Sequence, residues 1–186
     1  MRYSAVNHLG WFLAGLLAVC AGGCGGFNAE LAHRQGGYFD PEAVLPGQRI
    51  GYMLVRDRNG NVKSSARVEQ TCRTENRMEG ECRTELLDGD APLDFPHESR
   101  YHIHHEDNLD VTVTWKSSLG EQKGIVRGNH LLLWGQRRLP DNDTGLSVET
   151  RFHKLAGDGS PLMQIDSFSR FGIEVGSIYT TWIPAP

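Results

Sequence analysis

The feature that most constrains the fold of this chain is apolar and polar residues alternating along short segments. In the segment LDVTVTWK, residues 109–116, every second residue is apolar and the residues between them are polar. A period of two with one apolar side is typical of a strand that buries one face. A second segment, residues 52–70, contains Asn59-Gly60, which is the strongest short-range signal for a β-hairpin.

Turn signals recur at short and even intervals along the rest of the chain, at 107–108, 119–120, 128–129, 140–145 and 157–161. They divide it into about ten strands, a spacing typical of a sandwich or a barrel. A closed up-and-down barrel leaves no strand edge open. We therefore predict an all-β antiparallel barrel over residues 38–186. A short helical turn over Pro41–Leu45 is expected at the start of this domain, with Asp40 as its cap.

The first residues are typical of a secretory signal peptide. A basic residue, Arg2, precedes the apolar run Leu9–Val19, and small residues follow it. The run is too short to span a bilayer, which needs about 20 residues. The small residues before Cys24 fit a bacterial lipobox, although Ala21 replaces its usual Leu. We expect residues 1–23 to be a lipoprotein signal peptide and Cys24 to be lipidated; cleavage after Ala21 without lipidation is the alternative.

The predicted signal peptide and lipidation site determine the expected domain organisation, and they make the membrane the first expected partner. Residues 24–37 are expected to form a flexible tether, and residues 38–186 form one domain. Gly25 stands where an Asp would signal inner-membrane retention, so we expect a lipid anchor in the bacterial outer membrane and a periplasm-facing domain. The net charge is −4, and the basic residues form no stripe. Nucleic-acid binding is therefore not expected.

Two further cysteines, Cys72 and Cys82, bracket the segment TENRMEGE. If this segment is a hairpin that turns near residues 76–78, the two cysteines lie opposite each other. Disulfides persist in an oxidising compartment, and the C-x-x-C spacing of a redox pair is missing. We predict a structural disulfide between Cys72 and Cys82, with a redox switch as the less favoured alternative.

The segment YHIHHED, residues 101–107, is the strongest candidate for a metal site. His102 and His104 share one side of a strand, and Glu106 lies on the same side, a set that zinc or copper accepts. If Tyr101 and Ile103 define the buried side, however, the two histidines point to solvent. We favour the solvated face and keep His102 and His104 as weak metal candidates.

No catalytic residue is assigned from the sequence, and no cofactor is expected. The chain contains no H-E-x-x-H, G-x-S-x-G, Walker or G-x-G-x-x-G motif. The segment HLLLW, residues 130–134, is apolar on both sides. One side is expected to fill the barrel, and the other needs a cover: the helical turn, a partner or lipid.

The segments at Lys123–Pro140 and Pro161–Trp182 resemble the proteobacterial lipocalin-like lipoproteins known as domain of unknown function thirty-eight thirty-three. The resemblance covers about residues 38–183. It lies in G-x-x-x-G-N before an apolar-aromatic strand, and in a late S-[KR]-F-G-[IV]-x-[LV]-G. It implies a lipocalin-like barrel and no known activity. Within the late motif we expect Gly172 and Gly176 to bend the last strand where it closes on the first, and Phe171 and Ile173 to plug one end.

These observations are compatible with three functions, which we give in order of preference. The first is a non-catalytic barrel that binds a small apolar or lipid-like ligand in a cavity. The second is a structural or interaction lipoprotein with a filled barrel and an envelope protein partner, and an enzyme is a distant third. The residues expected to line the cavity are Val68, Leu86, Ile103, Val111, Val113 and Trp115.

Overall fold

The computed structural model describes residues 38–185 except 91–96, 107–109, 140–141 and 156–159. The predicted signal peptide, Cys24 and the tether lie outside the described residues. So do parts of the predicted turns at 107–108, 140–145 and 157–161.

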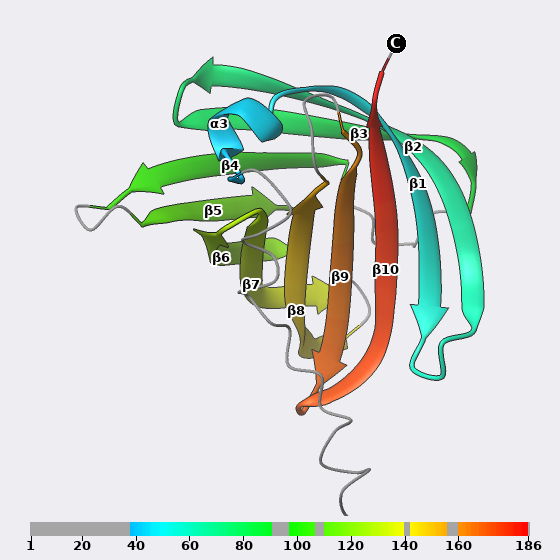
Figure 1. Ribbon diagram of the computed structural model, residues 1–186. Helices are drawn as coiled ribbons and strands as arrows, with labels where there is room; N and C mark the ends of the chain where they lie inside the picture. The colour runs from blue at the N-terminus through cyan, green and yellow to red at the C-terminus, as the bar shows by residue number, and fades with distance from the viewer. Residues whose placement is uncertain (1–37, 91–96, 107–109, 140–141, 156–159, 186) are drawn as a thin grey trace, which may run out of the picture.

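Ten antiparallel strands close into a single barrel (Figure 1). Each strand pairs with its neighbours in sequence, and β1 pairs with β10 to complete the ring. This confirms the predicted all-β up-and-down barrel. The strands are β1 (Gly47–Asp57), β2 (Val62–Asn76), β3 (Glu79–Gly89), β4 (Glu98–His105), β5 (Val111–Ser117), β6 (Gly120–Arg127), β7 (His130–Leu139), β8 (Asn142–Lys154), β9 (Leu162–Arg170) and β10 (Ile173–Pro184).

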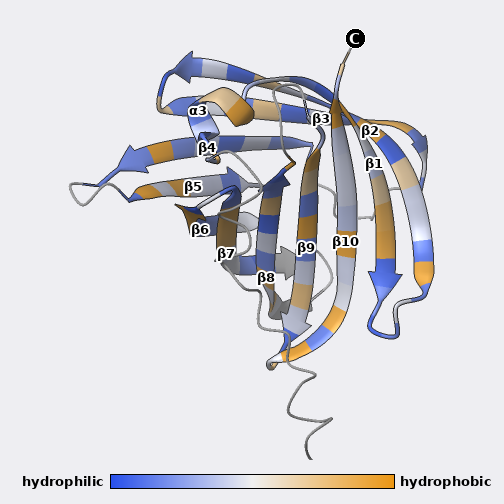
Figure 2. Cartoon of the chain, viewed as in Figure 1, coloured by the Kyte–Doolittle hydropathy of each residue, from blue (hydrophilic) through white to orange (hydrophobic). Residues whose placement is uncertain are grey.

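Apolar and polar residues alternate along the strands, as Figure 2 shows by colour. In β5, Val111 and Val113 are buried while the threonines that follow each of them are half-buried. The same period places Val68 of β2 and Ile103 of β4 inside the barrel with no exposed surface. Burial of alternate residues thus fixes which side of every strand faces inward.

The β1–β2 turn forms at Asn59-Gly60, as predicted. The Asp57 carboxylate accepts hydrogen bonds from the backbone N–H groups of Asn59 (2.9 Å) and Asn61 (3.0 Å), and it pairs with the Lys63 ammonium at 3.1 Å. Desolvation alone would raise the pKa of Asp57, but these hydrogen bonds outweigh it and lower the pKa to about 2. Gly60 has a φ of +82°, which glycine adopts without strain.

A short helix, α3 (Pro41–Val44), lies across one end of the barrel (Figure 1). Its cap and first residue are those predicted: Asp40 accepts a hydrogen bond from the backbone N–H of Glu42 at 3.0 Å, and Pro41 begins the helix. Arg49 of β1 donates hydrogen bonds to the carbonyls of Val44, Leu45 and Pro46, so the guanidinium holds the C-terminal end of α3 to the barrel wall. The described residues include no helix with the length and apolar character needed to cross a bilayer.

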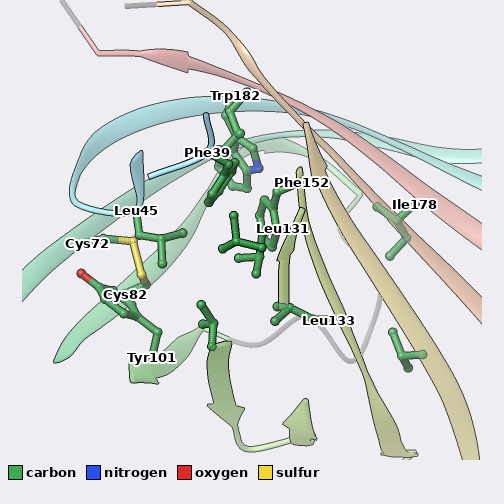
Figure 3. Packing of buried hydrophobic residues seen from close by; sticks show 14 of the residues in the cluster. Phe39, Leu45, Cys72, Cys82, Tyr101, Leu131, Leu133, Phe152, Ile178 and Trp182 are labelled. Atoms are coloured by element: carbon green, nitrogen blue, oxygen red, sulfur yellow. A yellow bond between two sulfur atoms is a disulfide. The ribbon is translucent and has the colours of Figure 1, made fainter. Parts of the chain in front are cut away.

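The segment around α3 closes this end, which we call the closed end. Phe39 and Leu45 insert into the barrel and are fully buried. In Figure 3 Phe39 lies next to Trp182 and close to Phe152 and Leu131, whereas Leu45 lies nearer the Cys72 and Cys82 side chains. The backbone N–H of Phe39 also donates to the carbonyl of Gly128 at 2.8 Å. The closed half is therefore a packed core.

Gly51 makes room for Trp182 in this core. A Cβ atom on Gly51 would lie 2.5 Å from the indole ring, closer than real Cβ contacts allow. A side chain at this position would therefore displace Trp182, the largest side chain at the closed end.

Cys72 and Cys82 form the predicted disulfide between β2 and β3. They are direct cross-strand partners ten residues apart, and both are buried. Figure 3 shows Leu45 beside the bond. By the loop-entropy relation, closing so short a loop contributes roughly 2–3 kcal/mol to the free energy of unfolding.

Replacing Phe39 with Ala should lower the free energy of unfolding by about 3–5 kcal/mol, because a buried aromatic ring is lost from a packed core. Chemical denaturation of the full chain measures this. The matched control is Tyr38→Ala at a neighbouring residue that is 55% exposed, where a change within about 0.5 kcal/mol is expected. Equal effects of the two substitutions would show that Phe39 does not close the barrel.

Candidate functional site: a cavity in the barrel lumen

The lumen contains a cavity of about 100 Å³ that residues from all ten strands line. It extends from Trp182 and Phe152 in the core to the β5–β6 turn at Leu119 and Gly120, at the end away from α3. We call that end the open end. The apolar side chains of the lining are Met53, Trp115, Leu119, Leu133, Val148, Phe152, Ile178 and Trp182; the polar ones are Gln70, Thr84, Ser99, Ser117, Gln122, Gln136, Arg137, Thr150, Gln164, Asp166 and Thr180.

A chain of hydrogen bonds across β6, β8, β9 and β10 orients the polar side of this cavity. The Asp166 carboxylate accepts from the Thr150 hydroxyl at 2.5 Å and from the Gln164 amide at 2.8 Å. Thr150 in turn accepts from the Gln122 amide at 2.9 Å, and Gln164 accepts from the Trp182 indole N–H at 2.9 Å. Each side chain holds the next, so we treat these five residues as one unit, the Asp166 network.

The carboxyl group of Asp166 lies deep among protein atoms, and its remaining exposure is to the cavity. Burial raises its pKa above the ordinary value of 3.8, although the hydrogen bonds from Thr150 and Gln164 and the positive charge of Arg137 oppose this. The Arg137 guanidinium lies 5.4 Å from the centre of the Phe168 ring. The cavity lining thus carries one acidic and one basic side chain.

The arrangement is suited to orienting a small bound molecule. The Asp166 network supplies fixed hydrogen-bonding groups. The rings of Trp115 and Phe152, whose centres lie 6.0 Å apart, supply apolar surface beside it, since Trp115 pairs with Gln122 and Phe152 pairs with Gln164 across neighbouring strands. Binding sites commonly combine apolar walls with a few well-placed polar groups.

The six predicted lining residues fall in three different places. Trp115 lines the cavity. Val68, Ile103, Val111 and Val113 are buried, but they are part of the packed core and not of the cavity wall.

The placement of Leu86 differs from the prediction, since its side chain is 44% exposed. Among the described residues, pairing between β3 and β4 covers Glu79–Arg83, followed by one backbone hydrogen bond from Thr84 to His97. In the described chain, the part of β3 that contains Leu86 is therefore paired on the β2 side alone. The inward side of a strand is covered only where the barrel wall continues on both sides.

Sequence reasoning missed the polar residues of the lining. One signal was present: Gln164 and Asp166 occupy the same side of β9 as Leu162 and Phe168, which are buried. Polar residues in register with core positions on a strand point to a polar interior.

The predicted plug at Phe171 and Ile173 is wrong, because these side chains are 89% and 66% exposed. They lie at the tip of the β9–β10 hairpin, which extends past the open end of the barrel (Figure 1). Gly176 does lie where the last strand meets the first. It pairs with Asp57 beside a bulge, and a Cβ there would lie 2.8 Å from the carbonyl oxygen of Arg56.

His102 and His104 lie half-buried on the outer side of β4, with ring centres 4.0 Å apart, while Tyr101 and Ile103 are buried. Nδ1 of His102 lies 2.5 Å from the Glu79 carboxylate. Burial, and after it the neighbouring His102, lower the pKa of His104. Among the described residues, no group of three or more His, Cys, Asp or Glu side chains is arranged to hold a metal ion.

The outer side of β7 keeps an exposed aromatic residue. Leu131 and Leu133 are buried inside the barrel, whereas Trp134 on the opposite side is 52% exposed. The helix α3 closes the end of the barrel, and Trp134 remains exposed.

The variant Asp166→Asn should gain stability relative to the wild type as pH rises from acid to neutral. In the folded protein the raised pKa means that ionisation of Asp166 opposes folding above that pKa, and this effect fades as pH falls toward 3.8. Denaturant unfolding of both chains across this range measures the difference. A difference that is constant with pH, or that grows toward acid pH, would contradict a buried Asp166 with a raised pKa.

Comparison with known proteins does not extend these findings. No protein-family model matches the sequence, and a search of curated proteins finds no match.

Proposed function

We propose that this protein is a non-catalytic barrel that binds a small amphipathic molecule in its lumen. The observation that carries the proposal is the cavity itself, which all ten strands line and which the Asp166 network borders on one side. A buried, hydrogen-bonded carboxyl lowers stability when it is ionised. Such a group is commonly retained for function.

The volume of the cavity and the charges of its lining limit the class of ligand that it can bind. A cavity of about 100 Å³ is smaller than the roughly 300–1,000 Å³ of a site for a drug-sized molecule. The ligand is therefore a small molecule, or one end of a longer lipid-like molecule that enters from the open end. The lining has one acidic and one basic side chain, and its other polar groups are amides and hydroxyls, which favours an uncharged polar group such as a hydroxyl or an amide. Its apolar part would contact Trp115, Phe152 and Ile178.

The second candidate is a structural or interaction lipoprotein of the cell envelope. The packed closed half, with Phe39 and Leu45 fully buried, supports it. The cavity of the open half favours the binding function over this alternative.

For location, we propose a lipid anchor at Cys24 in the outer membrane and a periplasm-facing barrel, as in the lipocalin-like family that the chain resembles. The Cys72–Cys82 disulfide suits an oxidising compartment. The described chain begins at Tyr38, next to the closed end. A tether from Cys24 would therefore join the barrel there and leave the open end free.

Metabolic labelling with palmitate tests the anchor. The wild type should incorporate label and Cys24→Ala should not, because the acyl chains attach through the cysteine. Cys20→Ala is the matched control and should label like the wild type. Equal labelling of wild type and Cys24→Ala would contradict the anchor without affecting the luminal site.

Ligand binding is tested by blocking the cavity at Ser117, a half-buried lining residue of β5 near the open end. In native mass spectrometry, the full-length wild type purified from its producing cells should carry an additional bound mass. Ser117→Trp should lose it, because the indole would occupy the cavity.

The control is Lys116→Trp, which adds the same ring at the neighbouring exposed position; it should keep the bound mass. A wild type without bound mass, or a Ser117→Trp variant that keeps it, would exclude the proposed site and favour the interaction function.

A further inference from the structure

The β9–β10 hairpin presents an apolar tip at the open end of the barrel. Phe171, Ile173 and Val175 are 89%, 66% and 40% exposed. Figure 2 shows two hydrophobic bands, separated by a hydrophilic one, at the start of β10 and at the end of the molecule opposite α3. Isolated exposed apolar residues are ordinary, but three within five positions form a patch.

The backbone conformation of the turn does not favour a phenylalanine at position 171. Phe171 and Gly172 have φ values of +53° and +77° and form the two-residue turn between paired Arg170 and Ile173. Turns with two positive φ values favour Asn, Asp or Gly. A bulky residue with positive φ is an outlier, and such outliers cluster at functional sites.

The charges around the tip are mostly positive. The β1–β2 hairpin lies beside the start of β10, since Asp57 pairs with Gly176. The Arg170 guanidinium lies 5.5 Å from the centre of the Phe171 ring. The turn regions of the two hairpins, residues 56–63 and 170–176, carry four basic side chains and two acidic ones, whereas the whole chain has a net charge of −4. The basic ones are Arg56, Arg58, Lys63 and Arg170, and the acidic ones are Asp57 and Glu174.

We propose that the β9–β10 tip docks onto a lipid bilayer that contains anionic headgroups. Exposed aromatic and aliphatic side chains enter the boundary between headgroups and acyl chains, and flanking basic side chains are attracted to anionic lipid. The contact is separate from an anchor at Cys24, which would join the closed end. It would bring the open end of the barrel, where the cavity begins, to the membrane surface.

The test is hydrogen exchange of the full-length chain with vesicles, because it reads the tip directly and separates it from any membrane contact of the N-terminal residues. Amides of residues 170–176 should be protected by vesicles of mixed phosphatidylglycerol and phosphatidylcholine, and much less by phosphatidylcholine alone. The variants are Phe171→Asn and Ile173→Thr. Asn suits the positive φ at position 171, so the turn is kept while the ring is lost.

Each variant should lower the protection of residues 170–176 on the mixed vesicles by about tenfold or more, the equivalent of removing one buried apolar side chain. The control, Ile183→Thr, changes an exposed residue at the other end of β10 and should bind like the wild type. Absent protection of the tip, protection equal on both kinds of vesicle, or protection unchanged in both variants would overturn the proposal.

Discussion

Closure of the ladder between β1 and β10 is the interaction on which the rest of the structure depends. Nine residue pairs join these strands, from Arg49–Pro184 to Asp57–Gly176. Closure gives every strand an inner and an outer side. Barrel diameter grows with strand number, and about eight strands enclose a lumen that side chains just fill. Ten strands enclose a wider lumen, which the inward side chains of the strands alone do not fill. Either other residues fill the remaining space or a cavity is left.

The space that the strand side chains leave unfilled is treated differently in the two halves of the lumen: it is filled in one and remains as a cavity in the other. At the closed end the chain supplies additional apolar side chains, Phe39 and Leu45, and Arg49 holds the segment that carries them in place. Toward the open end no such insertion is described, and the inward side chains include glutamines, threonines, Arg137 and the carboxyl of Asp166 beside the apolar ones. Their hydrogen bonds keep Asp166 satisfied although burial disfavours its charge. The same geometry thus produces a solid core and a cavity.

Local patterns in the sequence predicted the features that depend on neighbouring residues. The β1–β2 turn follows from Asn59-Gly60, the burial in β5 follows from strict alternation, and the disulfide follows from a short hairpin. Leu86 and Phe171 were misplaced, because their exposure depends on how far pairing extends: β4 stops short beside β3, and the β9–β10 hairpin extends past the barrel. A cavity was expected, but its position and its polar lining could not be predicted, since they depend on strand number and on a chain segment that fills only one end.

The central claim is that the lumen is closed by packing at one end and holds a polar-lined cavity at the other. A high-resolution crystal structure of the full chain tests it most directly. We expect electron density for ordered water or a bound molecule within hydrogen-bond distance of Asp166, with Phe39 seated in the core. A lumen filled by collapsed side chains around Asp166, or one open beneath α3, would contradict it.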